Sequence, residues 1–501
     1  MLLNKTTSQV KFILKICFFL ACINSIQGQK LKKISLEETL QLANKNSLDA
    51  FKAKREYAIN YWRYKSFKAK FLPRLDLNLQ PFNYNRSLVK RYNPTNNIDE
   101  YRQEQSLNLF SELSLSQNIM ATGTKVFINS TFNRLVNYGS NTIENYSTTP
   151  IRVGLIQPLM AFNELKWANK TALLEYEKAK KEYIFNQQKI NIQAISLFFN
   201  WALKNAKVTI AKETKINAEK LFKIAKKRYA IGAIEKDDLL NLELESFTSK
   251  TNLSKAVQEL EITISDLKLF LNKEDLDEFE PDLPILISKL KINLQEAESY
   301  MNRNNPDLLN TIIEKVYAER DLDKVIKENR FKLSINASYG LNQQSNTFSD
   351  AYRNFLDQQI VGVSFSMPIL DWGERKGNIK TAKMTKELTD IKIQQTINDV
   401  KRKLTLKVKN FNLQEEQVTV SLRAKEISGD SYKITEKRFL SGKVDLLRLL
   451  TSRKAWQTAT EQYIENLQLY WTYYYEVQQL TLYNFSKKKT LKASFESLLE
   501  N

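Results

Sequence analysis

The sequence predicts a mainly α-helical fold that also contains amphipathic β-strands and is built from two tandem repeats. The chain has 11 glycines and 9 prolines, about 4% of its residues against a typical value near 12%. Both residues oppose helix interiors, so the long stretches that lack them predict very long helices. Short segments of alternating polarity predict the strands, and two pairs of similar segments in the same order predict the duplication.

The two repeats differ by an insertion in the first one. The segment ISLEETLQLANKNSLD (34–49) aligns with INLQEAESYMNRNNPD (292–307) at an offset of 258 residues. KRYAIGAIEKDDLL (227–240) aligns with KRFLSGKVDLLRLL (437–450) at an offset of 210 residues, 48 fewer. The difference falls between Leu79 and Pro158, where LFSELSLSQNIMATGTKVFINSTFNRL is typical of an extra hairpin. We expect this hairpin to be a loop elaboration or an added layer.

These alignments divide the chain into a first repeat at 29–285, with the hairpin at about 86–150, a second repeat at 286–486 and a charged tail at 487–501. Each repeat is expected to run helix, strand, strand, long helix, turn, helix. The predicted helices cover about 35–70, 163–228 and 235–272, and then 293–328, 373–437 and 445–484. The predicted strands cover 74–80, 151–157, 332–339 and 361–367.

The predicted strands have one apolar and one polar face. In 74–80, Leu75, Leu77 and Leu79 alternate with polar residues. In a soluble sandwich the apolar face would cover a second sheet, whereas in an outer-membrane barrel it would face lipid. The strand pattern fits both arrangements.

Residues 1–28 are predicted to be a removable signal peptide. A basic beginning is followed by the apolar run ICFFLACINSI and by the small residue Gly28. Both cysteines, Cys17 and Cys22, fall in this segment, and the chain has no histidine. The mature chain therefore lacks the residues of Cys-His or Ser-His nucleophilic sites and of the usual zinc sites, so we expect no enzymatic activity, no cofactor and no metal. A lipid anchor on Cys22 is an alternative, since FLAC loosely resembles a lipobox.

The basic net charge does not indicate a nucleic-acid partner. The chain carries a formal charge of +20, but its lysines alternate with glutamates and aspartates and form no block. This distribution is typical of solvated helix faces. After residue 28, no apolar run approaches the roughly 18 residues that a membrane helix needs.

Taken together, these segments resemble the TolC-like outer-membrane efflux protein family. The resemblance runs from Ile34 to about Phe485 and is carried by the duplication and by specific motifs: SLEETLQLANKN, the strand–proline–helix junctions QPLMAFNE and MPILDWGERKG, and the turns KRYAIG…DLL and KRFLSG…DLL. It implies a homotrimer whose copies each give four or more strands to a 12-stranded barrel in outer-membrane lipid. The helices of each copy would form a long coiled-coil α-barrel in the periplasm.

The resemblance also implies a function. Such proteins are passive exit ducts of tripartite efflux or type I secretion systems, gated at the periplasmic end. Their partners are a periplasmic adaptor and an inner-membrane pump. A soluble, exported coiled-coil scaffold is the alternative that the helical pattern leaves open.

Two prolines and two glycines, one of each in every repeat, mark the expected structural junctions. Pro158 and Pro368 stand where a strand gives way to a long helix, since proline ends a ladder and suits a helix start. Gly232 and Gly442 are expected to end the long helices in the left-handed conformation.

The resemblance places the periplasmic entrance at these two helix turns. The family often has acidic residues at the constriction in its second turn, but the matching positions here hold Arg448 and Thr451. The first turn keeps Asp237 and Asp238, but the replacement of acidic residues by Arg448 and Thr451 in the second turn argues against a purely acidic, cation-selecting gate. Threefold symmetry would gather like charges near one axis, so we expect pairs between neighbouring copies to neutralise them. The candidate gate residues are Asp237, Asp238, Lys443, Asp445, Arg448 and Thr451.

Overall fold

The computed structural model describes residues 32–139, 141–276, 278–287 and 290–498. The predicted signal peptide, with Cys17 and Cys22, lies outside the described residues. The chain forms two compact units. Among the described residues, the first comprises 32–51 together with 187–291 and 409–476, and the second comprises 52–186, 292–408 and 477–498.

The four longest helices confirm the duplication in their lengths. Helices α4 (Glu164–Ala230) and α8 (Glu374–Leu440) each have 67 residues. Helices α5 (Lys236–Leu271) and α9 (Leu446–Thr481) each have 36 residues. Their bounds confirm the ranges predicted from the glycine- and proline-free stretches to within a few residues.

The shorter helices were predicted with the right extent, but each predicted helix is divided into two in the structure. The segment predicted at 35–70 forms α2 (Leu36–Asn46) and α3 (Leu48–Ala69), and that predicted at 293–328 forms α6 (Leu294–Asn304) and α7 (Pro306–Glu328). Ser47 and Asn305 interrupt them because their backbones are extended, with ψ of 148° and 126°. The Asn305 side chain accepts hydrogen bonds from two backbone N–H groups of the next turn, and Pro306 has no N–H to satisfy there.

The first unit is a helical bundle with a small parallel sheet. It holds α2, α5, most of α9 and the C-terminal parts of α4 and α8, together with β1 (Lys32–Ser35) paired with β6 (Phe279–Asp282). Its core is aromatic: Phe198, Trp201, Phe411 and Tyr470 are all at most 1% exposed. The rings of Phe411 and Tyr470 lie 5.1 Å apart and join α8 to α9.

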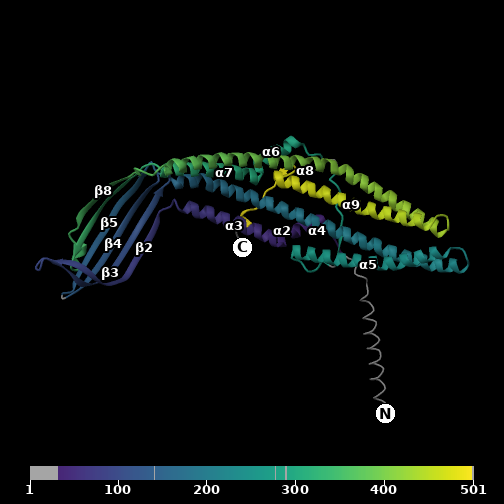
Figure 1. Ribbon diagram of the computed structural model, residues 1–501, viewed down its shortest axis with the longest axis horizontal. Coiled ribbons are helices and arrows are strands. Elements are labelled where there is room, and N and C mark those ends of the chain that lie inside the picture. Colours follow the sequence, from purple (N-terminus) through teal and green to yellow (C-terminus); the bar gives the residue numbers. More distant parts are fainter. Residues whose placement is uncertain (1–31, 140, 277, 288–289, 499–501) are drawn as a thin grey trace, which may run out of the picture. The chain divides into compact units, whose positions relative to one another are not determined.

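The second unit contains one antiparallel sheet of six strands (Figure 1). Their order is β2-β3-β4-β5-β7-β8. The strands are β2 (Arg74–Asn93), β3 (Ile98–Ile119), β4 (Thr124–Tyr138), β5 (Ile143–Leu159), β7 (Lys332–Ser345) and β8 (Leu356–Ser366). The four predicted strands are confirmed as parts of β2, β5, β7 and β8.

The extra hairpin corrects our expectation. It forms β3 and β4, which lie between β2 and β5 and pair on both sides. It is therefore neither a loop elaboration nor an added layer. Its backbone N–H and C=O groups find partners in the ladders of the neighbouring strands, which makes a place inside the sheet favourable.

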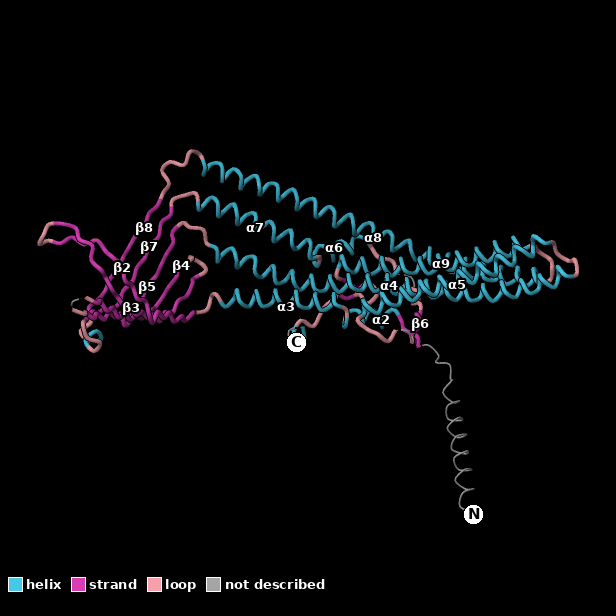
Figure 2. The backbone as a smooth tube through the Cα atoms, turned by 60° about the horizontal axis from the view of Figure 1, so that its bottom comes forward, coloured by secondary structure: helices cyan, strands magenta, loops and turns pink. Residues whose placement is uncertain are grey.

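Four helices meet the same end of this sheet (Figure 2). Helix α3 precedes β2 and α7 precedes β7, whereas α4 follows β5 and α8 follows β8. Because neighbouring strands alternate in direction, all four junctions fall at one end. The β2–β3, β4–β5 and β7–β8 connections lie at the other end, and the last of them carries the short 3₁₀ helix η1 (Asp350–Tyr352).

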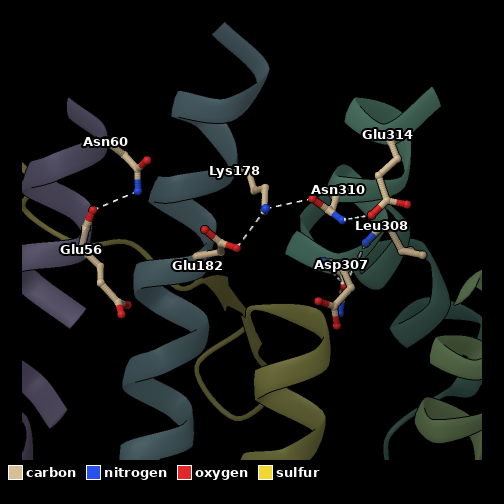
Figure 3. A network of polar contacts seen from close by, with 9 residues as sticks. Glu56, Asn60, Lys178, Glu182, Asp307, Leu308, Asn310 and Glu314 are labelled. Atoms are coloured by element: carbon tan, nitrogen blue, oxygen red, sulfur yellow. Dashed lines mark hydrogen bonds and ion pairs between the residues drawn. The ribbon is translucent and has the colours of Figure 1, made fainter. Parts of the chain in front are cut away.

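A polar network joins α4 to α7 in this unit (Figure 3). Lys178 on α4 donates to Asn310 Oδ1 on α7 over 2.8 Å and lies 3.3 Å from Glu182 Oε1. Asn310 in turn donates to Glu314 over 2.7 Å. The Lys178 ammonium group thus contacts side chains of both helices.

The C-terminal segment, expected to be a charged tail, also contributes to the core of the second unit. It carries β10 (Lys489–Thr490), which pairs with β9 (Tyr483–Asn484) just before it, and the 3₁₀ helix η2 (Glu496–Leu498). Leu491 and Phe495 pack against a buried cluster that includes Tyr57 and Tyr183. The Phe495 and Tyr57 rings lie 5.0 Å apart.

Candidate functional site

One face of the six-stranded sheet is a continuous apolar surface. Directly opposite residues in antiparallel ladders share a face, so the register places the row Leu75, Leu115, Ile128, Val153 and Tyr339 across five strands. Each of these side chains is at least 39% exposed. A soluble protein rarely leaves so many aligned apolar side chains uncovered, which indicates that this face meets an apolar environment.

The other face of the sheet is polar and internally connected. Glu112 on β3 accepts hydrogen bonds from Asn129 on β4 over 2.8 Å and from Asn78 on β2 over 3.4 Å. Asn129 also accepts from Arg152 Nε on β5 over 3.1 Å and is only 5% exposed. This network spans four strands and includes both strands of the extra hairpin. We had not predicted it, because its members are far apart in the sequence.

The strand-to-helix junctions contain the two predicted prolines and two caps. Pro158 lies beyond Ile156, the last β5 residue that pairs with β4, and still faces Ser334 of β7. Pro368 is exposed and lies two residues after the end of β8. Asn163 and Asp371, which we had not predicted, accept hydrogen bonds from the first-turn N–H groups of Lys166 and Arg375, over 3.0 Å and 3.1 Å. Asn and Asp before a helix are the sequence signal that could have identified them.

The two predicted turn glycines both adopt the left-handed conformation in the first unit. Gly232 has φ of +74° and Gly442 has φ of +75°. After each glycine the next residue donates its N–H to a carbonyl of the last helical turn, from Ala233 to Arg228 and from Lys443 to Arg438, both over 2.9 Å. These bonds satisfy carbonyls that have no partner within the helix.

The two turns are also held to each other. The Arg228 guanidinium at the end of α4 donates to the carbonyl of Leu440 at the end of α8 over 2.9 Å. Below the turns, Leu221, Ala225, Leu242 and Leu449 are buried in one apolar cluster. The structure thus brings the predicted gate residues of both repeats to one end of the first unit.

The six candidate gate residues are all exposed there. Asp238, Asp445 and Gly442 line one cavity of about 240 Å³. Asp445 accepts the N–H of Arg448 over 2.8 Å and so caps α9, and the Thr451 hydroxyl donates to the Leu447 carbonyl over 2.8 Å. Among the described residues, no ion pair within the chain involves Asp237, Asp238, Lys443 or Arg448. Asp445 and Thr451 therefore have local structural roles, whereas the other four charges are available to a partner.

Helix α8 carries a second apolar stripe that the chain does not cover. One side of the helix is buried in the first unit, for example at Phe411 and Tyr432. On another side, apolar residues recur every seven positions, and each is more than half exposed: Leu413, Val420, Ile427 and Ile434. Such a repeat is typical of a helix that packs against another helix in a coiled coil. The seven-residue spacing is present in the sequence and could have revealed the stripe.

The described residues offer no metal-ligand cluster of three or more acidic, histidine or cysteine side chains. In the same part of the chain, none of the helices combines the length and the apolar character that crossing a membrane requires.

A family comparison matches most of the chain. The model of the family described as "Outer membrane efflux protein" matches residues 40–273 and 301–481. It matches once in each half, which agrees with the tandem duplication. No curated protein matches the chain.

Solved structures of similar fold cover nearly the whole chain. The Campylobacter jejuni CmeC outer membrane channel is 14% identical, with a TM-score of 0.66 over 93% of this chain and 88% of the other. The Vibrio cholerae outer membrane protein VceC is 11% identical, with a TM-score of 0.61 over 89% and 95%. The open state of the Neisseria gonorrhoeae MtrE outer membrane channel is 13% identical, with a TM-score of 0.60 over 89% and 88%. At these identities the likeness establishes the fold, which confirms the predicted fold class.

Proposed function

We propose a specific function from one established premise, that the chain belongs to the outer membrane efflux protein family. Proteins of this family are transport conduits, so the chain is an outer-membrane efflux channel protein and not an enzyme. Our proposal is that it is the passive exit duct of a tripartite efflux or type I secretion system. It would act as a homotrimer, with its helices in the periplasm and gated at its periplasmic end. Its partners would be a periplasmic adaptor and an inner-membrane pump.

The observation that carries this proposal is the uncovered apolar face of the antiparallel sheet, opposite a polar, hydrogen-bonded face. Outward apolar and inward polar residues are the arrangement of an outer-membrane barrel. The alternative, a soluble exported scaffold, would need a second layer over Leu75, Val153 and their neighbours, and the described residues include none.

Membrane fractionation with an alkaline wash tests the proposal directly. We expect the full-length chain to stay with the outer membrane after the wash and to run as a trimer in mild detergent. Cells that lack this protein should retain the cargo that its inner-membrane partner pump exports. Release of the chain by the wash as a detergent-independent rod would refute the proposal and favour the scaffold.

The exposed charges at the helix turns support a gate made between copies. Asp237 and Asp238 lie in the first turn of α5, and Lys443 and Arg448 flank the start of α9, so each copy offers both signs at the same end. Three copies around an axis would bring like charges together, and alternating pairs of opposite sign would relieve their repulsion. We therefore propose that Asp237 or Asp238 of one copy pairs with Lys443 or Arg448 of the next and holds the entrance closed.

Single-channel recording of Asp238→Ala tests this gate. We expect higher conductance and weaker closure, because the variant removes one partner of each pair around the axis. The charge-swapped double variant, Asp238→Arg with Arg448→Asp, should restore closure, whereas either single reversal should not. Conductance and selectivity equal to the wild type in Asp238→Ala would exclude Asp238 from the gate.

A further inference from the structure

The number of strands in the sheet bears on how a channel wall would close. The family resemblance implied 12 strands, which corresponds to four from each of three copies. This chain places six strands in one continuous sheet, and of these six strands β2 and β8 are the two that pair on one side alone within the described residues. A long, unpaired strand edge is a template for pairing with another chain.

The two free edges are suited to each other in direction. Because the sheet is antiparallel throughout and has six strands, β2 and β8 run in opposite directions. If β8 of one copy lay beside β2 of the next, the alternation would continue around a ring without a parallel pair. An odd number of strands in each copy would not allow this.

The edges also agree in length. Strand β8 has 11 residues. Strand β2 is longer, but β4, which lies on the far side of β3 from β2, pairs with β3 only as far as Gln105. Beyond that level β2 and β3 continue as a two-stranded ribbon (Figure 1). The ribbon is charged, with Lys90 2.8 Å from Asp99 and Arg91 2.9 Å from Glu104. Gln105 pairs with Arg86, so only residues 74–86 of β2 lie level with the rest of the sheet, and this stretch of 13 residues is comparable in length to β8.

The inserted strands have the alternating polarity expected of strands in a barrel wall, not of a segment that fills the barrel lumen. Leu113 and Leu115 on β3 and Ile128 on β4 are exposed on the apolar face, in line with Leu77 and Leu75 on β2. On the opposite face Glu112 and Asn129 belong to the polar network. A hairpin folded into a lumen or over a rim would not need the same two-faced pattern as its neighbours.

We infer that three copies of this chain close an 18-stranded barrel, in which β8 of each copy pairs with β2 of the next and the inserted hairpin is part of the wall. This inference rests on the proposed trimeric channel and adds its wall composition. With strands about 4.8 Å apart and tilted about 40°, the backbone radius is about 18 Å, against about 12 Å for 12 strands. The cross-section is then more than doubled, so the lumen in the membrane admits bulkier cargo.

Electron cryomicroscopy of the full-length chain, purified from outer membranes into nanodiscs, counts both copies and strands. Three copies with 18 strands is the expected result. Three copies with 12 strands would overturn the inference and leave the proposed function intact. Two copies with 12 strands would overturn the inference and the trimer. A particle without a membrane ring would overturn the proposed function, and the inference with it.

A matched pair of variants on β3 tests the wall independently. We expect Leu113→Arg to reduce the membrane-inserted, heat-modifiable fraction by about tenfold or more, because it would place a charge against lipid. Ser114→Arg, the next residue on the polar face and directly opposite Asp76, should insert like the wild type. Equal insertion of both variants would show that β3 does not face lipid and would overturn the inference.

Discussion

Asp323 shows how one carboxylate connects two helices of the second unit. Its Oδ2 atom accepts a hydrogen bond from the indole N–H of Trp167 on α4 over 2.9 Å and lies 2.9 Å from Lys327 Nζ on its own helix, α7. Burial by itself raises the pKa of Asp323, but the bonds from Lys327 and Trp167 outweigh it, so the pKa lies below its ordinary value. The folded state therefore favours the charged form.

This shift predicts a pH-dependent contribution to stability. A carboxylate whose pKa is depressed by folding stabilises the fold above its unfolded pKa, near 4, and loses that contribution as the pH falls through the folded value. We expect Asp323→Asn to lower the free energy of unfolding by about 1 kcal/mol at pH 7. The difference from the wild type should vanish near pH 2. Thermal unfolding in detergent at both pH values measures it, and a difference independent of pH would contradict the assignment.

At the scale of elements, the helix turns require glycine because of the backbone conformation and not because a side chain would lack room. A Cβ added at Gly232 or Gly442 would meet no atom within 4 Å, but both glycines have a positive φ that L-residues rarely adopt. Gly377 in α8 has equally open surroundings and no positive φ. The three positions therefore separate strain from crowding.

We predict opposite effects of the same substitution at these sites. Gly232→Ala and Gly442→Ala should each destabilise the fold by about 1 kcal/mol, because alanine is strained in the left-handed region. Gly377→Ala should stabilise it by about 0.5–1 kcal/mol, because alanine is the better helix former. Thermal or denaturant unfolding of the three variants provides the comparison. Destabilisation by Gly377→Ala would show that the alanine side chain itself, and not φ, causes the loss.

At the level of the full protein, the described residues leave an apolar surface uncovered on the sheet and another on α8. The sheet surface is suited to lipid, as argued above. The α8 stripe repeats every seven residues, which is suited to another helix. We attribute it to contact between copies, which also explains why a helix with a well-buried opposite side has such exposed residues as Val420 and Ile427.

Substitutions in the stripe should therefore weaken assembly without unfolding the chain. We expect Val420→Ser with Ile427→Ser to shift the population from trimers to smaller species in mass measurements in mild detergent. The control is Lys409→Ser with Glu416→Ser, exposed positions that are also seven residues apart on α8. A trimer population unchanged by the stripe variant would remove α8 from the interface.

The long helices, their turns and the duplication could be predicted from the amino-acid sequence, since these features follow from local rules. Glycine and proline oppose helix interiors wherever the chain goes, and Gly232 and Gly442 were predictable because a left-handed residue favours glycine in any context. The alternation in 74–80 gave the polarity of its two faces in the same way. The breaks at Ser47 and Asn305 were missed because an extended residue between two helices leaves the overall helical pattern almost unchanged.

The position of the inserted hairpin and the contacts between distant residues became apparent in the folded chain alone. Strand neighbours are chosen by hydrogen-bond partners that can be hundreds of residues apart, as for β5 and β7 across the two repeats. Contacts such as Glu112 with Asn129 or Trp167 with Asp323 leave no periodic trace in the sequence. Local patterns record what each segment prefers, whereas the pairing of segments is settled by the free energy of the folded chain as a whole.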